Sequence, residues 1–396
     1  MKNTLTRRSF LEVAGAGAAA WGLQSAQAQG GTALPIDSSG GRDPISDRKV
    51  RVGIIGYGVC RYGAEFQFQD HPNVEIVAVS DLFPDRRDAL AQACRCAKTY
   101  DSLEELIEDD TIEAVFVATD APQHAKHAID ALNHGKHVAM STPAVWGSLE
   151  EADALFDAVK RTGLKYMLFE TSAYQEDLTA MRHIYNAGGF GKVVYCEGEY
   201  YHYMPTPIDS YNGWRIGNPP QWYPSHATAY YVCVTGGSFT EVTCEGMPSA
   251  IDYMKPENNV YKNPFGTEIA LLRTSEGGIA RMALSWDTPG PDGITVGRLR
   301  GQEGSFFGKY EGLMKPEELP DLNRGPLPAP VVPGADEGTH GYLMNEFVMS
   351  ILEDRTPLVN VAVALNMTVA GVVAHQSALN DGETMKIPQY AMALGA

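Results

Sequence analysis

The first half of the chain alternates short apolar runs with stretches of helical spacing. Continuous apolar strands that are separated by helices indicate a parallel sheet with both faces covered. The predicted strands are residues 50–55, 74–79, 114–118 and 166–169, and the predicted helices are residues 102–108, 124–134 and 149–162. This pattern is typical of a Rossmann-type domain, in which the ligand binds beyond the carboxyl ends of the strands.

The pattern changes after Tyr174, where extended segments rich in aromatic and β-branched residues follow one another. Strands in succession, without helices between them, indicate a mainly antiparallel sheet. These strands are predicted at residues 193–203, 238–244, 267–274, 278–286 and 293–300. Helices are predicted at residues 178–187, 342–353 and 361–380, and a Pro/Gly-rich loop or arm at residues 314–338.

The sequence therefore predicts an α/β protein of two domains. Residues 48–170 are expected to form an N-terminal Rossmann domain that binds NAD. Residues 171–396 are expected to form a substrate-binding α/β domain with a large, mostly antiparallel open sheet. Residues 29–47, which are rich in Gly, Ser, Asp and Pro, are expected to be a linker.

The first 28 residues have the layout of an export signal. Arg7-Arg8 precedes an apolar stretch rich in Ala and Gly, and Ala26-Gln27-Ala28 offers a small-residue cleavage site. Residues 1–28 are therefore expected to be a twin-arginine signal peptide, and the folded protein is expected to be periplasmic or secreted. A frayed, cationic N-terminal helix is the alternative.

Composition excludes several classes of partner. The net charge is −18, with 49 acidic and 31 basic residues, which argues against a nucleic-acid ligand. No long apolar run follows the N-terminus, so no membrane insertion of the mature chain is expected. The six cysteines lack zinc spacing and are expected to be buried thiols, with a disulfide between two of them as the alternative. Histidine pairs such as His124 and His127 have no accompanying carboxylate or cysteine set, so no metal site is expected.

A dinucleotide fingerprint follows the first predicted strand. Gly56-Tyr57-Gly58 would let the backbone approach a pyrophosphate, and Asp81, at the end of the second strand, would accept hydrogen bonds from the adenosine ribose. The carboxylate disfavours a 2′-phosphate, so NAD is expected rather than NADP. Arg61 stands at the third glycine position, with Gly63 two residues later. A plain strand-to-helix turn is the alternative.

Two further segments resemble the Gfo/Idh/MocA family. Val117-Ala118-Thr119 with His124 is similar to its fourth-strand motif, and Gly135-Lys136-His137-Val138 is similar to its Gly-Lys-His-Val. The resemblance implies a sugar or polyol substrate and places Thr119, His124, Ser141 and Thr142 at the cofactor. Many members continue with Glu-Lys-Pro, whose lysine helps to deprotonate the reacting hydroxyl, whereas this chain has Ser141-Thr142-Pro143.

A branch of that family without the lysine consists of NAD-dependent glycosidases, including α-N-acetylgalactosaminidases. In that branch NAD takes a hydride from sugar C3, the acidified C2 proton is removed, the glycosidic bond is eliminated, water adds and the hydride returns. The segments that resemble this branch are residues 170–174, 197–202, 214–215 and 223–226. The resemblance implies Tyr174 as a base, His226 as a proton donor or hydroxyl base, and substrate contacts from Tyr200, His202, Arg215 and Tyr223.

The residues by themselves support these roles less strongly. His226, expected in a loop before an apolar stretch, suits acid–base work, with a packed or capping histidine as the alternative. Strand alternation places Tyr200 and His202 on one face, and Tyr195, Tyr201 and Tyr203 on the other.

The expected function is NAD-dependent oxidoreduction of a carbohydrate, with hydride transfer between a ring carbon and bound NAD. A glycoside hydrolase that recycles tightly bound NAD is the first alternative. A non-catalytic sugar-binding protein with structural NAD is the second. The exposed aromatic sheet predicts a homo-oligomer, because the resemblance implies that such open sheets pair.

Overall fold

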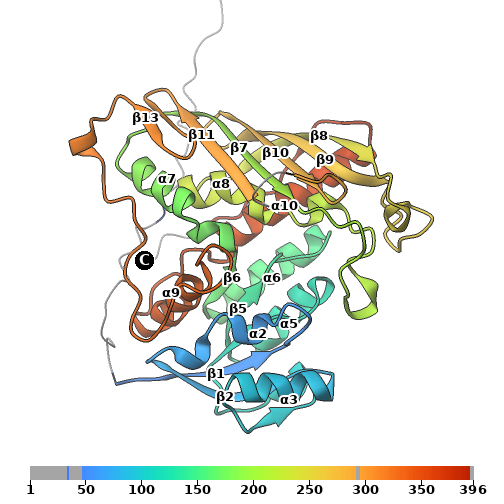
Figure 1. Ribbon diagram of the computed structural model, residues 1–396, viewed down its shortest axis with the longest axis vertical. Helices are drawn as coiled ribbons and strands as arrows, with labels where there is room; N and C mark the ends of the chain where they lie inside the picture. Colours follow the sequence, from blue (N-terminus) through green and yellow to red (C-terminus); the bar gives the residue numbers. More distant parts are fainter. Residues whose placement is uncertain (1–33, 35–46, 291–294, 393–396) are drawn as a thin grey trace, which may run out of the picture.

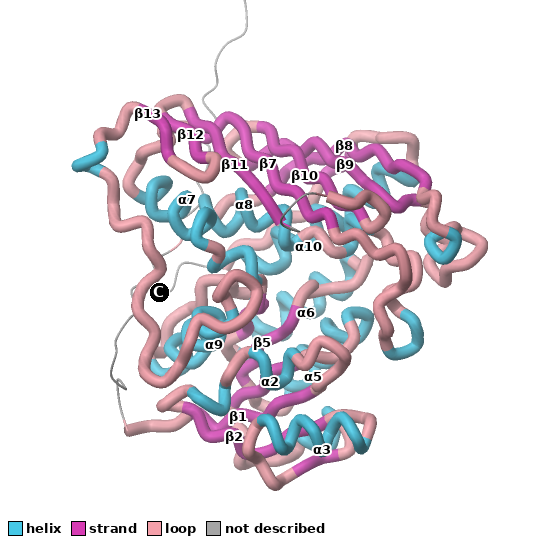
Figure 2. The backbone as a smooth tube through the Cα atoms, viewed as in Figure 1, coloured by secondary structure: helices cyan, strands magenta, loops and turns pink. Residues whose placement is uncertain are grey.

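The computed structural model describes residue 34, residues 47–290 and residues 295–392. Two sheets lie one above the other, and helices fill the space between them (Figures 1 and 2). The predicted signal peptide and nearly all of the predicted linker lie outside the described residues. This architecture confirms the predicted pairing of a Rossmann domain with a second α/β layer.

The first sheet is parallel, with strand order β3-β2-β1-β4-β5-β6. The order reverses direction at β1, and a ligand crevice forms at such a switch point. The strands are β1 (Val50–Ile55), β2 (Val74–Ser80), β3 (Thr99–Tyr100), β4 (Ala114–Val117), β5 (His137–Ser141) and β6 (Tyr166–Phe169). The helices are α2 (Tyr62–Glu65), α3 (Pro84–Ala93), α4 (Leu103–Ile107), α5 (His124–Asn133) and α6 (Leu149–Thr162).

The second sheet is mixed, with strand order β13-β12-β11-β7-β10-β9-β8-β14. Its pairs are antiparallel except β7 with β10, which run parallel. The strands are β7 (Val193–Tyr201), β8 (Phe239–Pro248), β9 (Phe265–Thr274), β10 (Ile279–Ser285), β11 (Thr295–Gly301), β12 (Gly304–Phe306), β13 (Tyr310–Gly312) and β14 (Met385–Lys386). Strand alternation along β7 is as predicted, because Tyr200 is buried while Tyr195 and Tyr201 are partly exposed.

One expectation for this half is wrong. The chain does not pass directly from β7 to the next strand, because α8 (Ser225–Thr235) intervenes. His226 therefore lies in the first turn of a helix and not in a loop. All but one residue of α8 are buried, and a helix that is apolar on every side has no amphipathic period to reveal it.

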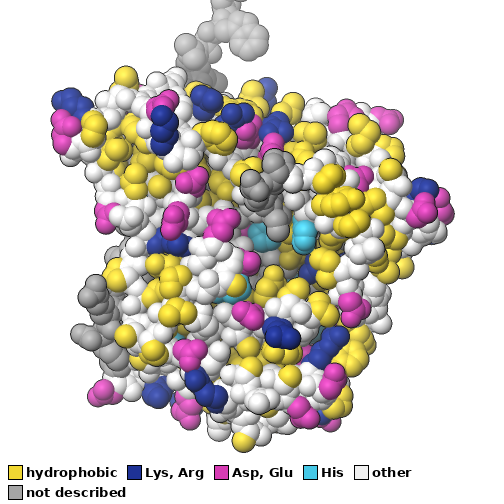
Figure 3. Space-filling view, viewed as in Figure 1, with side chains coloured by type: hydrophobic (Ala, Val, Ile, Leu, Met, Phe, Trp, Pro, Cys, Tyr) yellow, Lys and Arg dark blue, Asp and Glu magenta, His cyan; other side chains and the backbone are white. Residues whose placement is uncertain are grey.

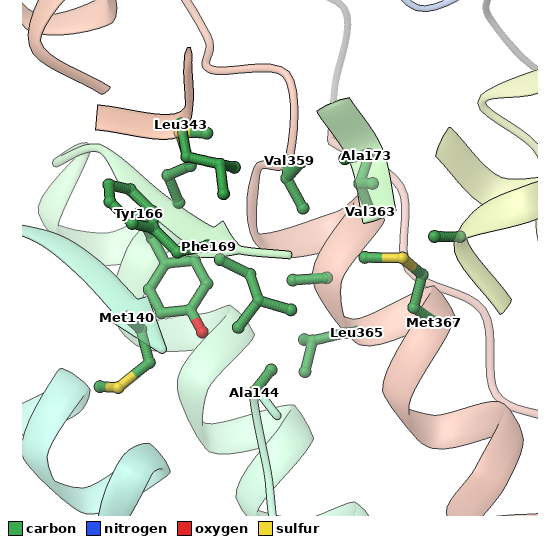
Figure 4. Close-up of a cluster of buried hydrophobic side chains, with 14 of the residues drawn as sticks. Met140, Ala144, Tyr166, Phe169, Ala173, Leu343, Val359, Val363, Leu365 and Met367 are labelled. Carbon is green, nitrogen blue, oxygen red and sulfur yellow. The ribbon is translucent and has the colours of Figure 1, made fainter. Parts of the chain in front are cut away.

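Three helices cover the inner face of the second sheet, namely α7 (Glu176–Asn186), α8 and α10 (Val361–Leu379) (Figure 1). The helix α10 is apolar enough to resemble a membrane span, but 94% of its apolar window is buried inside the protein. Figure 4 shows its side chains packed with those of β5 and β6. It is thus a core helix that joins the two layers.

The helix α9 (His340–Leu352) packs against β1 and β6 of the first sheet. Between β13 and α9 the chain runs as a long loop with one short 3-10 turn, which agrees with the predicted Pro/Gly-rich arm. The 3-10 turns are η1 (Phe68–Asp70), η2 (Ala121–Gln123), η3 (Thr171–Tyr174), η4 (Tyr211–Gly213), η5 (Pro220–Trp222), η6 (Asp252–Met254) and η7 (Pro316–Glu318).

Candidate active site

The turn after β1 lets the backbone approach a ligand closely. Gly56 has a φ of 88°, and a Cβ built on it would lie 2.4 Å from the carbonyl oxygen of Ala118. Only glycine fits both this backbone conformation and this contact. Gly58 also has a positive φ, of 60°, and a Cβ there would meet open space. The turn therefore leaves bare backbone at the mouth of the crevice.

Asp81 holds this turn in place. One carboxylate oxygen accepts the backbone N–H of Tyr57 at 2.8 Å, and the other accepts that of Phe83 at 2.9 Å. The carboxylate lines a cavity of about 240 Å³ together with Gly56, Gly58 and Thr119. Its remaining lone pairs can accept ribose hydroxyls. This cradle fits an adenine dinucleotide.

Gly63 has the structural role of the third glycine of the fingerprint, which allows a helix to pack closely on the first strand. A Cβ on this residue would lie 2.5 Å from the carbonyl oxygen of Gly56 and 2.9 Å from Leu90. Close packing of helix on strand thus depends on Gly63, while Arg61 adopts a left-handed φ of 55° just before the short helix α2. The fingerprint is displaced by two residues rather than broken.

A second cavity continues the crevice toward the other layer. It is lined by Tyr57, Gly58, Val59, Cys60, Tyr62, Arg86, Ala118, Thr119, Asp120, Ala121, His124, Ser141, Thr142, Asp209, Ser210, Tyr211, Trp214, Arg215 and Tyr223. His124 is buried, and its Nδ1 donates to the carbonyl oxygen of Pro143 at 2.7 Å. Its other ring nitrogen lies 3.3 Å from Ser141 Oγ. His124 thus ties together the ends of β4 and β5 beside the cofactor crevice.

Thr142 stands at the junction between cofactor and substrate. Its hydroxyl lies 3.0 Å from the Tyr223 hydroxyl, which also donates to the Thr142 carbonyl oxygen at 3.1 Å. The Arg215 guanidinium lies 4.1 Å from the Trp214 ring centre and 6.0 Å from that of Tyr223. Arg215 is thus held by two aromatic rings and brings a fixed positive charge to the cavity.

A third cavity, of about 340 Å³, is the candidate substrate pocket. It shares Tyr62, Ser141 and Thr142 with the cofactor crevice, so the two spaces are continuous. Figure 3 shows histidine side chains in a hollow near the middle of this face. The lining residues are Tyr62, Phe66, Ser141, Thr142, Phe169, Thr171, Gln175, Tyr200, His202, His226, Thr295, Asp336 and Glu337.

His226 is paired with a buried carboxylate. Its Nδ1 donates to Glu170 Oε1 at 2.6 Å, and this oxygen also accepts the backbone N–H of Ser172 at 3.0 Å. Burial by itself lowers the pKa of His226, but the attraction of Glu170 and their hydrogen bond outweigh it and raise the pKa above the usual value. The pKa of Glu170 is lowered for the same reason, against the opposing effect of its burial. The pair therefore favours an imidazolium whose Nε2 is left for the pocket.

His202 has the opposite shift in the same pocket. Its Nδ1 lies 3.2 Å from the Tyr200 hydroxyl, and the Tyr200 ring centre lies 4.6 Å from that of His226. Burial lowers the pKa of His202, and the charges of Arg215 and His226 lower it further. Two titratable groups whose surroundings move their pKa values apart form a natural acid–base pair.

Most of the predicted site residues come together as expected. The predicted cofactor residues line the two crevice cavities, and the predicted substrate residues Tyr200, His202, Arg215 and Tyr223 line the two cavities nearest to Thr142. Tyr174 is the exception. It is fully buried, stacks on Tyr342 with ring centres 6.0 Å apart, and lines none of the cavities found in the described residues.

The base role predicted for Tyr174 is therefore wrong for this geometry. Replacing Tyr174 by phenylalanine should keep the ring packing and leave kcat/KM within about threefold of wild type, since the phenol does not reach the pocket. Steady-state kinetics with circular dichroism as a folding control would check this. A hundredfold fall in kcat with an intact fold would restore the phenol to the mechanism.

Glu170 is the functional residue that the sequence analysis did not single out. It directly follows the buried strand β6, and a carboxylate at the carboxyl end of a parallel strand faces the ligand crevice. Tyr62 and the acidic loop residues Asp336 and Glu337 were also missed. Asp336 lies 165 residues beyond Thr171, which lines the same pocket. No local sequence pattern therefore predicts that this loop reaches the pocket.

Comparison with known proteins adds the family. Residues 50–170 match the profile of the Gfo/Idh/MocA oxidoreductase family, NAD-binding Rossmann fold. The Rossmann domain belongs to the Gfo/Idh/MocA family. The expected cofactor, NAD, is thereby confirmed for this domain. The apo scyllo-inositol dehydrogenase from Lactobacillus casei has a similar fold, with a TM-score of 0.66 and 14% identity over 86% of this chain and 99% of that one.

Two curated relatives of this chain carry the name of a glycosidase family. Glycosyl hydrolase family 109 protein 1 of Bacteroides fragilis is 32% identical over 47% of this chain and 43% of its own length. A glycosyl hydrolase family 109 protein of Saccharopolyspora erythraea is 26% identical over 77% of this chain and 73% of its own length. This chain thus spans less than half the length of the first of these two relatives.

Proposed function

We propose that the protein is a glycoside hydrolase that works with tightly bound NAD. The observation that carries the proposal is the His226–Glu170 pair in a pocket continuous with the NAD crevice, at a site where Thr142 replaces the lysine of the family's dehydrogenases. A threonine hydroxyl cannot act as a tuned amine base, so proton transfer falls to the histidines. The glycosyl hydrolase names of two relatives support the same choice.

The chain's own residues divide the proton transfers. Gly56, Asp81 and Thr142 would hold NAD, which would supply reversible hydride abstraction from a ring carbon while the proton of that carbon's hydroxyl passes to solvent in the pocket. His202 Nδ1 lies 3.2 Å from the Tyr200 hydroxyl, and in the Nδ1–H tautomer the neutral ring has a lone pair on Nε2 that accepts the proton of the neighbouring carbon. His226 donates a proton from Nε2 to the departing glycosidic oxygen, while Glu170 fixes its ring.

Deuterium incorporation tests this proposal against its competitors. Hydrolysis in D₂O should release the aglycone and leave deuterium on the carbon next to the transiently oxidised one, because that proton is exchanged with solvent. A dehydrogenase, which the continuous cofactor and sugar cavities also allow, would give an oxidised sugar with its glycosidic bond intact. If neither an aglycone nor an oxidised sugar is formed while sugar binding is retained, the protein is a non-catalytic sugar-binding protein.

The two histidine shifts predict a bell-shaped pH profile. Activity needs neutral His202 and protonated His226, so kcat rises as pH passes the lowered pKa of His202 and falls as pH passes the raised pKa of His226. Glu170→Gln removes the charge that raises the pKa of His226. We expect the alkaline limb to move down by about one pH unit or more.

A matched control is Glu108→Gln, since Glu108 lies 3.1 Å from the exposed His134 on the surface. This variant should leave the pH profile unchanged. An alkaline limb that stays in place in Glu170→Gln would show that His226 does not set it.

We also propose that residues 1–28 direct export through the twin-arginine route, as their Arg7-Arg8 pair and Ala26-Gln27-Ala28 site suggest. Export in the folded state suits an enzyme that acquires NAD in the cytoplasm and keeps it. The N-terminal sequence of periplasmic protein, and its loss from the periplasm in an Arg7→Lys, Arg8→Lys variant, are the tests.

We further propose self-association through the outer face of the second sheet. Within the described residues no helix covers this face (Figure 1), and its exposed apolar side chains come from the adjacent strands β9 and β10 and from β11, on the other side of β7. They are Ile269, Leu271, Ile279 and Val296. Apolar patches of this kind mark interfaces. Light scattering should show an oligomer for wild type and a smaller species for Leu271→Glu.

A further inference from the structure

An outer hollow adjoins the substrate pocket on the side away from NAD. Its volume is about 490 Å³, compared with about 340 Å³ for the pocket itself. Gln175, Thr295 and Glu337 line both spaces, so one continuous site extends outward from His226. The outer part is lined by Gln175, Glu176, Asp177, Tyr230, Thr295, Val296, Gly297, Phe307 and Glu337.

Gln175 presents hydrogen-bond donors at the boundary between the two spaces. Its side-chain carbonyl oxygen accepts the Tyr230 hydroxyl at 2.8 Å, which fixes the orientation of the amide. The Nε2 group has no hydrogen-bond partner within the described part of the chain, although the residue is only 9% exposed. An amide nitrogen with two unused N–H groups, on a side chain held in place at its other end, is suited to bind an oxygen of a ligand.

Phe307 supplies an apolar platform in the outer hollow. It lies between β12 and β13, is 63% exposed, and has the Arg298 guanidinium 5.4 Å from its ring centre. An exposed aromatic ring in a cavity with polar walls offers a flat surface on which the C–H face of a sugar ring can stack.

The charge of the outer wall selects among sugars. Asp177 and Glu337 line it, whereas Arg324 pairs with Glu176 at 3.0 Å and Arg298 lies against Phe307, so Asp177 and Glu337 are the lining carboxylates without an ion pair in the described residues. Burial, followed by repulsion from Glu176, raises the pKa of Asp177. Asp336 and Glu337 both adopt left-handed φ values, 47° and 57°, and Arg324 anchors the carbonyl of Glu337 at 3.0 Å. An acidic wall held in this way repels anionic groups.

We propose that the outer hollow is a second binding subsite, which holds the leaving-group ring of a glycoside of at least two sugars. This ring is neutral or carries an amine, and it is not sulfated or carboxylated. Phe307 stacks on the ring, Gln175 Nε2 donates to an oxygen near the scissile bond, and Asp177 with Glu337 excludes negative charge. The inference rests on the proposed hydrolysis for its description of this ring as a leaving group.

Calorimetry with NAD-loaded protein in the His226→Gln background, in which the proposed hydrolysis is blocked, measures binding to the subsite without turnover. The probes are methyl glycosides of glucose, galactose and their N-acetylamino forms, together with the disaccharides that carry the same terminal sugars. At least one disaccharide should bind about tenfold more tightly than its methyl glycoside. Phe307→Ala should bring the two within about threefold while leaving the methyl glycoside unchanged.

A matched control is Leu313→Ala, because Leu313 is 76% exposed but lines neither space. Its disaccharide preference should equal that of wild type. A 6-sulfate on the outer ring should weaken binding to wild type about tenfold and to Glu337→Gln much less. Equal affinities for methyl glycosides and disaccharides, or a preference that survives Phe307→Ala, would refute the subsite. A disaccharide preference in calorimetry, together with no bond cleavage by the wild-type protein in a separate assay, would instead count against the proposed hydrolysis.

Discussion

His226→Gln is expected to lower kcat for aglycone release by about two to four orders of magnitude, the range that a positioned general acid contributes. Glutamine can occupy similar space and accept or donate hydrogen bonds. Its side-chain amide does not titrate, however, so it cannot transfer a proton to the leaving oxygen as the imidazolium of His226 does. The same change leaves Glu170 buried without its imidazolium, so some loss of stability is also expected. Stopped assays of aglycone release, with NAD content measured in parallel, would check the effect.

Two controls separate chemistry from folding for this variant. His134→Gln removes an exposed histidine that pairs with Glu108, and it should retain full activity. A double variant, His226→Gln with Glu170→Gln, removes the buried charge and should recover stability without recovering kcat. Near-normal kcat in a folded, NAD-loaded His226→Gln protein would exclude His226 as the acid.

Gly56→Ala is expected to abolish retention of NAD. A Cβ at this position would lie 2.4 Å from the Ala118 carbonyl oxygen, and the residue has a φ of 88°. The turn must therefore shift, and with it the backbone that approaches the pyrophosphate. We expect at least a hundredfold rise in the Kd for NAD, measured by fluorescence titration.

Gly163→Ala is the matched control for this prediction. Gly163 caps α6 with a φ of 67°, but a Cβ there would meet nothing within 4 Å. It therefore has comparable left-handed strain without the steric clash, and its affinity for NAD should stay normal. If Gly56→Ala bound NAD as tightly as Gly163→Ala, the proposed placement of the cofactor would be wrong.

Periodicity predicted the longer strands of both sheets except β5, because their full burial or their alternation of buried and exposed residues leaves a pattern in the sequence. It missed β5 and the short strands β3, β12, β13 and β14, which have two or three residues each. β1 and β6 have the predicted bounds, as does α6. The helix α3 was missed, because Leu90 is its sole buried residue and the rest of the helix is polar or small. The parallel pairing of β7 with β10 was also missed, since pairing across intervening elements leaves no local signal.

In the candidate site, too, the residues of a local motif were predicted, whereas contacts between distant parts of the chain were not. The cofactor residues follow from a local motif, and Asp81 binds the turn that the motif forms. The pairing of His226 with Glu170 joins residues 56 positions apart, and the burial of Tyr174 under Tyr342 depends on how α9 packs. Such contacts are set by tertiary structure, so sequence reasoning identified His226 but neither its partner nor the position of Tyr174.

The central claim is that NAD stays bound and is regenerated in every turnover. The most direct measurement follows absorbance at 340 nm and aglycone release together, using purified protein with its own bound nucleotide and no added cofactor. The account predicts many aglycones released per bound NAD, with at most a transient rise at 340 nm. A stoichiometric, lasting rise without aglycone release would contradict it and would identify a dehydrogenase.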